Sequence, residues 1–371
     1  MLTVYHSNRL EVLAEQLAAQ LQEHGATEIL RPRSVVVPHP SMGRWLQLHI
    51  ARRHGIAANL QFPLPARFIW DIFRRLDPAL PKRSGYDRGI LSWRIDGLLS
   101  KVAQADPALY QPLLRYLEEA SDATEAALKR YQLAQQLADA YDRYLTYRPT
   151  WIRAWGEQEG AGSGAADEAW QAALWRELDA GEQDPHWVAL MDRLEQPELL
   201  EQAAALHGGP IYVFGLTSVS PAYLHIFRRL AEPLDVHLFF PNPSLHWWSD
   251  IVPERVRLKL DQRLRALREQ HGLSDPDPRH LETGHPLLAS MGKTGADFLA
   301  ALYEDTLTQD EDCFVDPAEG SQSLLARLQR DVLLLNEPET EAEQSCDGSI
   351  CVHSCHSPLR EVQVLHDQIL A

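Results

Sequence analysis

The sequence is poor in cysteine and methionine and has no long apolar run. Four cysteines in 371 residues do not make a disulfide framework, which fits a reducing compartment. No apolar stretch approaches the ~20 residues that span a bilayer. The first residues also lack the basic and then apolar pattern of a secretory signal. We therefore expect a cytoplasmic protein.

Positive charge is scarce, because 35 Lys and Arg face 52 Asp and Glu and leave a formal net charge of −17. This excludes a surface that coats nucleic acid generally, so any such contact needs a local basic line or a shielded channel. The hydrophobic content of 45% is that of an ordinary globular protein. The length predicts two or three domains.

The segment from Ser34 to Arg75 indicates how the chain folds. Val35 to Val37 form a short β-branched run that is typical of a buried strand. Pro38 and Pro40 end this strand because neither has an amide donor. A helix capped by Ser41 follows, and a proline-rich stretch then leads into a helix with aromatic residues. Such a strand–turn–helix unit is how an α/β domain places a binding edge.

Three further strands predict a parallel sheet. Val4 and Tyr5 begin the first strand, and Asn8 and Glu11 would cap the helix after it. Strands return at Ile211–Phe214 and Asp235–Phe240. Strand–helix units in tandem give parallel sheets with right-handed crossovers.

The stretch from Pro81 to Leu200 has little strand signal, and we expect it to be a helical domain inserted between strands. Its expected helices span Tyr86–Val102, Ala108–Glu119, Thr124–Tyr147 and Ala169–Leu178. Toward the end of the chain we expect helices at Glu254–Gln270, Phe298–Thr308 and Gln322–Asn336, a loop at Gly272–Pro286, an acidic linker at Asn336–Gly348, a strand at Ile350–Ser354 and a helix at Leu359–Leu370.

Five segments carry a family resemblance: LTVYHSNRLEVL, GIAANLQFPLPARFIWDIF, YDRYLTYRPTWI, VFGLTSVSPAYLHIF and CHSPLREVQVLHD. In this order they resemble the amino-terminal part of the RecC family, the gamma subunit of exodeoxyribonuclease V. The matches extend over nearly the whole chain. Members of the family are much longer, so the resemblance identifies the chain as an amino-terminal fragment.

The resemblance implies an α/β fold with a superfamily-one helicase-like parallel sheet, which is P-loop NTPase-like but has degenerate motifs. A phosphate loop ends in Gly-Lys-Ser/Thr between the first strand and its helix, whereas Tyr5–Arg9 contains neither glycine nor lysine. The later strand that should end in an acidic pair for magnesium reads Val213–Leu216. Gly292-Lys293-Thr294 matches the end of a phosphate loop, but we interpret it as a turn before a helix at Ala296 because no clear strand precedes it.

We expect three domains. Residues 1–80 plus 205–345 would form the helicase-like α/β domain without ATPase motifs, and residues 81–204 the inserted helical domain. Residues 346–371 would hold a linker and the first strand and helix of a further, truncated domain.

The resemblance implies a non-catalytic DNA-binding subunit of a RecBCD-type helicase–nuclease, which acts in double-strand break repair and homologous recombination. Such a subunit channels unwound single-stranded DNA and recognises the Chi sequence. It has no cofactor of its own, because ATP and Mg²⁺ are used by the RecB-like and RecD-like partners of the heterotrimer. Two alternatives stay open: a structural scaffold without sequence readout, and an ATPase with an unrecognised site.

Aromatic and basic residues alternate in two segments, around Trp70 and along the helix that ends at Tyr147. From the residues alone, packing in a core explains these aromatics best. The resemblance instead favours the stacking of single-stranded bases, which is worth ~1–3 kcal/mol per base. The family's reading positions correspond here to Pro38, Pro40, Arg44, Leu64, Trp70, Asp139, Ala140, Asp142, Arg143 and Arg148.

Some of these positions depart from the family pattern. Pro38 and Pro40 replace polar side chains, and proline offers a base neither a polar side chain nor an amide donor. Arg44 and Arg143 replace glutamines. Ala189 stands where the family has an arginine just after the tryptophan that corresponds to Trp187. The sequence therefore favours passage of single-stranded DNA over the reading of a particular sequence.

Cysteines and histidines gather near the end of the chain, at Cys351, His353, Cys355 and His356. The first three alternate along the expected strand, but no second ligand pair occurs at the spacing of a zinc site. We therefore predict strand residues without a metal.

Overall fold

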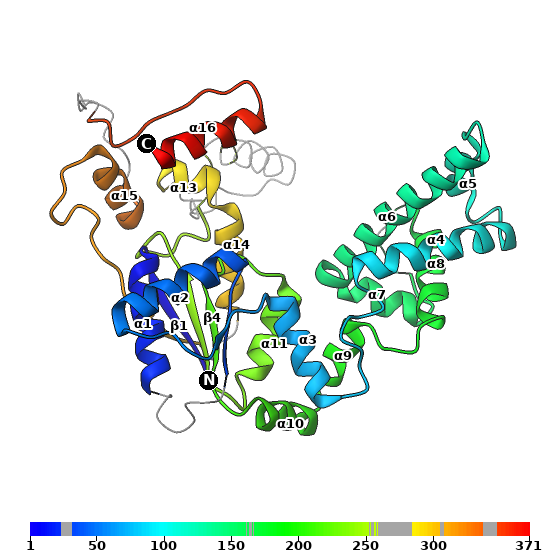
Figure 1. Ribbon diagram of the computed structural model, residues 1–371, viewed down its shortest axis with the longest axis horizontal. Coiled ribbons are helices and arrows are strands. Elements are labelled where there is room, and N and C mark those ends of the chain that lie inside the picture. The colour runs from blue at the N-terminus through cyan, green and yellow to red at the C-terminus, as the bar shows by residue number, and fades with distance from the viewer. Residues whose placement is uncertain are drawn as a thin grey trace, which may run out of the picture. The chain divides into compact units, whose positions relative to one another are not determined.

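The computed structural model describes residues 1–23, 32–160, 162, 165, 167–251, 253, 256, 258, 284–304, 308–336 and 347–371 (Figure 1). The predicted helix at Glu254–Gln270, the loop at Gly272–Pro286 and the linker at Asn336–Gly348 lie largely outside these residues.

A six-stranded sheet organises the fold. Its order is β3-β2-β4-β5-β1-β6. Strand β2 pairs in parallel with β3 and β4, and β4 pairs in parallel with β5. The strands are β1 Leu2–Ser7, β2 Arg33–Val36, β3 Leu60–Gln61, β4 Ile211–Phe214, β5 Val236–Pro241 and β6 Thr308–Asp312.

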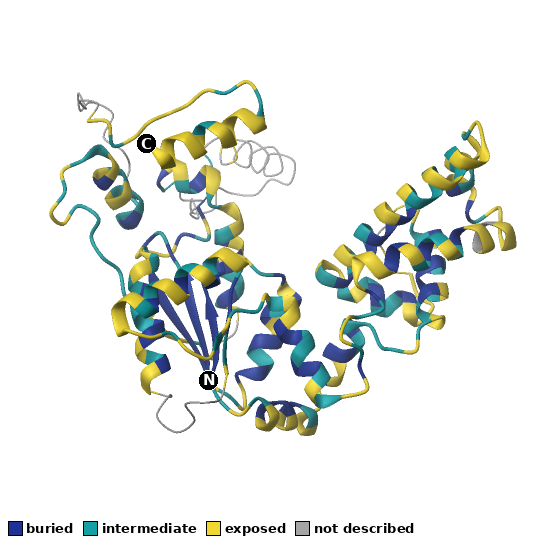
Figure 2. Cartoon of the chain, viewed as in Figure 1, coloured by how far each residue is buried: buried dark blue, intermediate teal, exposed yellow. Residues whose placement is uncertain are grey.

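Strands β1 and β5 are also parallel, because the Val236 amide donates to the Met1 carbonyl while the Asn242 amide donates to that of Ser7. The prediction that the strands near Val4, Val35, Ile211 and Val236 share one largely parallel sheet is thus confirmed. Every residue of β1 and β4 is buried. Strands that are buried along their whole length are typical of a parallel sheet that is covered on both faces. Figure 2 shows this buried sheet in dark blue.

Helices α1 Leu10–Glu23 and α2 Pro40–His54 follow the first two strands. The predicted caps of both are wrong. His39 caps α2, since its Nδ1 accepts from the Met42 amide at 3.2 Å, and Pro40 takes the first helical position instead of only ending the strand. Asn8 does not cap α1, because its side chain makes two hydrogen bonds with the backbone of Val315.

Among the described residues, seven helices lie between β3 and β4 beyond α3 Pro65–Leu76, which confirms that this stretch is mainly helical. Its core holds the fully buried Tyr141, Trp155 and Trp175. Helices α4 and α6 pack along each other. The helices are α4 Arg88–Ala105, α5 Gln111–Glu118, α6 Ala123–Tyr147, α7 Pro149–Gly156, α8 Glu168–Ala180, α9 Trp187–Arg193 and α10 Pro197–His207.

The described chain divides into two compact units. One contains Met1–Tyr5, Ala14–Phe239 and Asp305–Glu311, so the helices between β3 and β4 and most of the sheet share a unit, together with α11 Pro221–Leu230. The other contains His6–Leu13, Phe240–Glu304 and Asp312–Ala371. The expected boundaries of three domains stay a prediction.

Two assignments toward the end of the chain are corrected. The helix predicted at Phe298–Thr308 is α14 Lys293–Leu302, and β6 lies between it and α15, where the sequence indicated an acidic turn between two helices. The predicted strand at Ile350–Ser354 is irregular, and Val352 is 93% exposed. Alternating apolar residues make a strand only when a neighbour completes the ladder, and no described segment does so here. The remaining helices are α13 Pro286–Met291, α15 Leu324–Leu334 and α16 Pro358–Leu370, the last two as predicted within a few residues.

Candidate nucleic-acid interface

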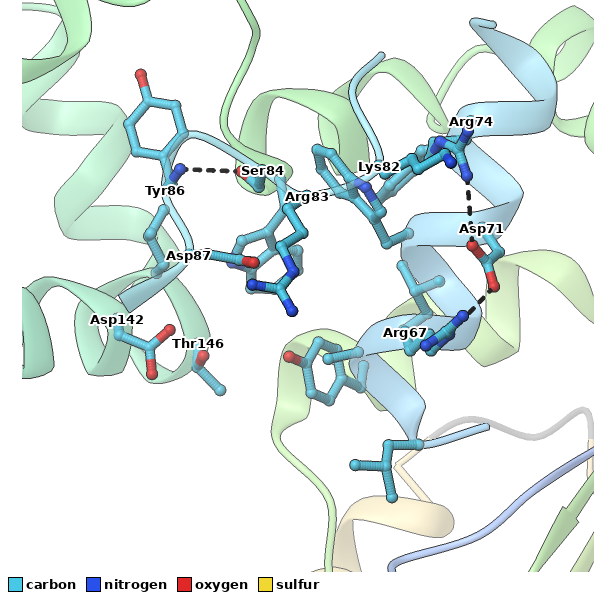
Figure 3. Close-up of a pocket in the computed structure, with 18 residues that line it drawn as sticks. Arg67, Asp71, Arg74, Lys82, Arg83, Ser84, Tyr86, Asp87, Asp142 and Thr146 are labelled. Atoms are coloured by element: carbon cyan, nitrogen blue, oxygen red, sulfur yellow. Dashed lines mark hydrogen bonds and ion pairs between the residues drawn. The ribbon is translucent and has the colours of Figure 1, made fainter. Parts of the chain in front are cut away.

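A cavity of about 700 Å³ lies between α3, the segment that joins α3 to α4, and the end of α6 (Figure 3). We call it the aromatic–basic cavity. Its cations are Arg67, Arg74, Lys82 and Arg83, its carboxylates are Asp71, Asp87 and Asp142, and its rings are those of Trp70, Phe73, Tyr86, Trp187 and Tyr223.

The polar wall of this cavity is one face of α3. Leu64, in extended conformation, precedes the helix, and Pro65 takes its first position. The helix also carries the buried Phe68, Ile69, Ile72 and Phe73, of which Ile69 and Phe73 line the cavity and Phe68 and Ile72 do not. Packing of these apolar residues leaves the charged residues and Trp70 on the cavity side of the helix.

Trp70 is half-buried. Its exposure is therefore intermediate between that of a core residue and that of an open stacking surface, the two alternatives considered from the sequence. Its Nε1 donates to the Pro81 carbonyl oxygen at 3.1 Å. This bond satisfies the polar atom of the ring and fixes the indole against the middle of the segment that joins α3 to α4. The indole ring therefore lines the cavity in an orientation that this hydrogen bond fixes.

The cations of the cavity differ in how far they are neutralised. Arg67 and Arg74 lie at 3.9 and 4.0 Å from the Asp71 carboxylate. Lys82 and Arg83 are exposed and make no ion pair with another described residue. In Figure 3 the Arg83 guanidinium points into the open space between α3 and α6. Two cations are therefore available to an anionic ligand.

The opposite wall brings together rings that are distant in sequence. The Trp187 and Tyr223 rings lie 5.4 Å apart at 45°. Burial raises the pKa of Tyr223 to about 12, Asp142 adds to the rise, and a hydrogen bond with Thr146 opposes it. The Tyr223 hydroxyl therefore stays neutral at physiological pH.

Burial, and next the neighbouring Asp139 carboxylate, raise the pKa of Asp142, while Arg88 opposes the rise. Burial also raises the pKa of Asp87, against the effect of Arg83. Both carboxylates thus sit where negative charge is disfavoured.

A second cavity of about 550 Å³ shares Leu64, Arg67 and Asp71 with the first and adds Pro40 and Arg75. It is also lined by Phe62, against which α2 packs closely. A Cβ on Gly43 would lie 2.5 Å from the Phe62 Cβ, so only glycine fits there.

The structure brings only some of the predicted reading residues together. Leu64, Trp70 and Asp142 line the aromatic–basic cavity, and Pro40 joins Leu64 in the second cavity. Asp139 lines a third cavity on α6. Pro38, Arg44, Ala140, Arg143 and Arg148 lie outside these three cavities. The assignment of all ten as reading positions stays a prediction.

Two of the predicted reading arginines that lie outside the cavities contact neighbouring side chains. Arg143 Nη2 pairs with the Asp139 carboxylate at 2.6 Å. The Arg148 guanidinium lies 5.6 Å from the Trp151 ring centroid, at the junction of α6 and α7.

Lys82, Arg83, Trp187 and Tyr223 are among the cavity residues that were not predicted as reading positions. Lys82 and Arg83 had a usable signal, because two adjacent cations stand in a loop that contains proline, serine and glycine. Trp187 and Tyr223 had none, since only tertiary packing brings them to this cavity.

The turn after β1, where a phosphate loop would stand, has other contacts. Ser7 Oγ accepts from the Arg9 amide at 3.1 Å, and Asn8 binds Val315. Gly292 joins α13 to α14 and donates its amide to the Leu288 carbonyl oxygen at 2.7 Å. Lys293 therefore begins a helix that follows another helix, not a strand, which differs from the strand–loop–helix setting of a phosphate loop.

Within the part of the chain that the structure describes, no group of three or more His, Cys, Asp or Glu side chains could hold a metal ion. Cys351 is exposed in the irregular segment before α16. Of the described helices, none combines the length and apolar character needed to cross a bilayer.

The turn after the first strand of this largely parallel α/β sheet lacks the glycine and lysine of a phosphate loop. The unit that holds most of the sheet also contains the aromatic–basic cavity. The rings and cations of this cavity make it a candidate site for single-stranded nucleic acid. The chain belongs to the RecC family: the family model described as RecC, N-terminal domain, matches residues 2–335.

Curated relatives agree with this assignment. The RecBCD enzyme subunit RecC of Escherichia coli K12 is 34% identical over 100% of this chain and 35% of its own length. The protein of the same name from Haemophilus influenzae is 32% identical over 100% of this chain and 36% of its own length. That from Mycolicibacterium smegmatis is 28% identical, with 100% and 31% covered. The chain thus spans about a third of the length of these relatives.

Proposed function

We propose that this chain is the DNA-handling, non-catalytic part of a RecBCD-type helicase–nuclease and that it holds unwound single-stranded DNA in the aromatic–basic cavity. The observation that carries the proposal is the meeting of five rings and four cations in one cavity of an otherwise acidic protein. Single-strand sites combine such rings, on which bases stack, with cations along the backbone.

In this cavity a base would stack on the exposed part of the Trp70 indole, which the bond to Pro81 holds in place. Lys82 and Arg83 would contact phosphates, since neither forms an ion pair with another described residue. Asp142 would accept a hydrogen bond from a base amino group such as that of cytosine. A chain that recognises Chi needs contacts of this last kind.

ATP hydrolysis with Mg²⁺ and strand cleavage would belong to partner subunits that resemble RecB and RecD, in a cytoplasmic heterotrimer that processes double-strand breaks for recombination. The names of the relatives, each a RecBCD enzyme subunit, support this assignment. So does the turn after β1, which lacks the glycine and lysine of a phosphate loop.

The test is fluorescence anisotropy of a labelled oligothymidylate titrated with the chain at several salt concentrations. We expect saturable binding that weakens with salt, with a logarithmic slope of roughly −0.7 for each phosphate contact. A duplex of the same length should bind less tightly, because its bases are not available for stacking. Absence of binding at low salt would favour the alternative of a structural scaffold.

A further inference from the structure

A third cavity, of about 530 Å³, lies between the start of α4 and α6 and differs in chemistry from the other two. It is lined by Arg88, Gln132, Gln135, Gln136 and Asp139, and we call it the glutamine groove. It contains no ring, and its one cation and one anion pair with each other at 3.1 Å. The groove is therefore close to neutral and rich in hydrogen-bonding groups.

Two of its amides are available to a ligand. Gln135 Nε2 donates to the Tyr131 hydroxyl at 3.2 Å. Gln132 and Gln136 are exposed and make no side-chain hydrogen bond with another described residue. Each amide offers a donor and an acceptor side by side.

The groove continues from the aromatic–basic cavity along one face of α6. Gln132, Gln135, Asp139, Asp142 and Thr146 recur every three or four residues, so they share a face. The first three line the groove and the last two line the cavity. This face is about 21 Å long at 1.5 Å per residue. That length corresponds to about six nucleotides at stacked spacing.

An aromatic pair with one exposed ring adjoins the far end of the groove. Trp93 on α4 is 65% exposed, and its ring lies 4.8 Å from that of Tyr131. Tyr131 is next to Gln132 in sequence and is bonded to Gln135. A strand that leaves the groove thus finds a ring to stack on, which a bound peptide does not need.

We propose that the glutamine groove reads base edges, with a preference for adenine, on a strand whose backbone the aromatic–basic cavity holds. A glutamine amide pairs in two hydrogen bonds with N6 and N7 of adenine. The neutral groove gives phosphates no net attraction, whereas the cavity offers cations. The inference rests on the proposed function, and it assigns sequence readout to glutamines that are not among the ten predicted reading positions.

The experiment compares two dodecanucleotides, one of alternating cytosine and adenine and one of alternating cytosine and thymine, by anisotropy with the chain. We expect the adenine strand to bind about five- to tenfold more tightly. Replacing adenine by 7-deazaadenine removes the N7 acceptor and should abolish most of this preference. The double variant Gln132→Met/Gln136→Met keeps side-chain length and helix propensity. It should lose the preference but keep the salt slope.

Gln202→Met, an exposed glutamine on α10, is the matched control and should retain the preference. Equal affinity of the unchanged chain for both strands would overturn the readout while leaving the proposed function intact. The same conclusion would follow if the double variant lost affinity for both strands to the same extent. A double variant that keeps the preference but no longer associates with a RecB-like subunit would make the groove a protein contact. Absence of binding to either strand would overturn both proposals.

Discussion

At the scale of single residues, Trp70 and Asp142 carry most of the account. One presents a half-buried ring held by a hydrogen bond, and the other a carboxylate whose pKa is raised by burial. Trp70 is half-buried, whereas the Asp142 side chain is exposed at the cavity.

Trp70→Ala should weaken single-strand binding by ~1–3 kcal/mol, the value of one stacked base. Because the indole is only half-buried, the loss in the free energy of unfolding should stay below the ~3–5 kcal/mol of a core tryptophan. Anisotropy and thermal unfolding of the same samples measure the two effects. The fully buried Trp175, changed to alanine, provides the core reference. A Trp70 variant that loses binding only in proportion to folded protein would reject the stacking role.

Asp142→Asn should stabilise the fold slightly at neutral pH. The raised pKa means that the folded state disfavours the carboxylate, so the wild-type chain loses stability as pH rises through that pKa. The amide avoids this cost, which is below about 1 kcal/mol because the group is partly solvated. Urea unfolding at pH 7 and at pH 3 measures the difference, which should vanish at the lower pH. A variant that is less stable at pH 7 would contradict the assigned cause.

At the scale of elements, the segment between α3 and α4 supplies the aromatic–basic cavity with the two cations that form no ion pair, Lys82 and Arg83, which attract anions. Lys82 and Arg83 stand next to Pro81, whose carbonyl holds Trp70. Ring and cations are therefore positioned by the same short stretch of chain.

Lys82→Ala and Arg83→Ala should each lower binding to all single strands alike and reduce the salt slope by roughly 0.7. Lys101→Ala, an exposed cation on α4, should leave the slope unchanged. Anisotropy at four or more salt concentrations gives these slopes. Unchanged slopes in both variants would remove the segment from the interface.

The turn after β1 should give the chain no useful affinity for ATP. Isothermal titration with ATP and Mg²⁺ should show no saturable micromolar binding, and Lys293→Ala should not change the heat signal. A saturable isotherm would revive the alternative of an ATPase with an unrecognised site.

Much of the fold could be predicted from the sequence, because buried parallel strands are short β-branched runs and Pro38 and Pro40 mark where the second one ends. Helix boundaries were less accessible: His39 and Ser41 are both plausible caps, and only the backbone conformation decides between them. The strand expected at Ile350–Ser354 was wrong because a strand depends on a partner that local sequence does not reveal.

The candidate site was predictable only in part. Leu64 and Trp70 are close in sequence and adjoin the same cavity, whereas Trp187 and Tyr223 reach it through tertiary packing alone. The resemblance supplied Asp142, which no local pattern marks as different from the many other carboxylates of this acidic chain.

At the scale of the whole molecule, a net charge of −17 and a binding site for a polyanion are compatible because Arg67, Arg74, Lys82 and Arg83 line the same cavity. The acidic remainder disfavours binding elsewhere on the surface. The account thus predicts one localised site in place of a diffuse basic surface.

The most direct test of this central claim is photo-crosslinking of the chain to a single strand that carries iodouracil, with the crosslinked residues mapped by mass spectrometry. The account predicts crosslinks at Trp70, Trp187 or Tyr223, and their loss when an unlabelled single strand competes. Crosslinks confined to rings outside the cavity, such as the exposed Trp247, would contradict it.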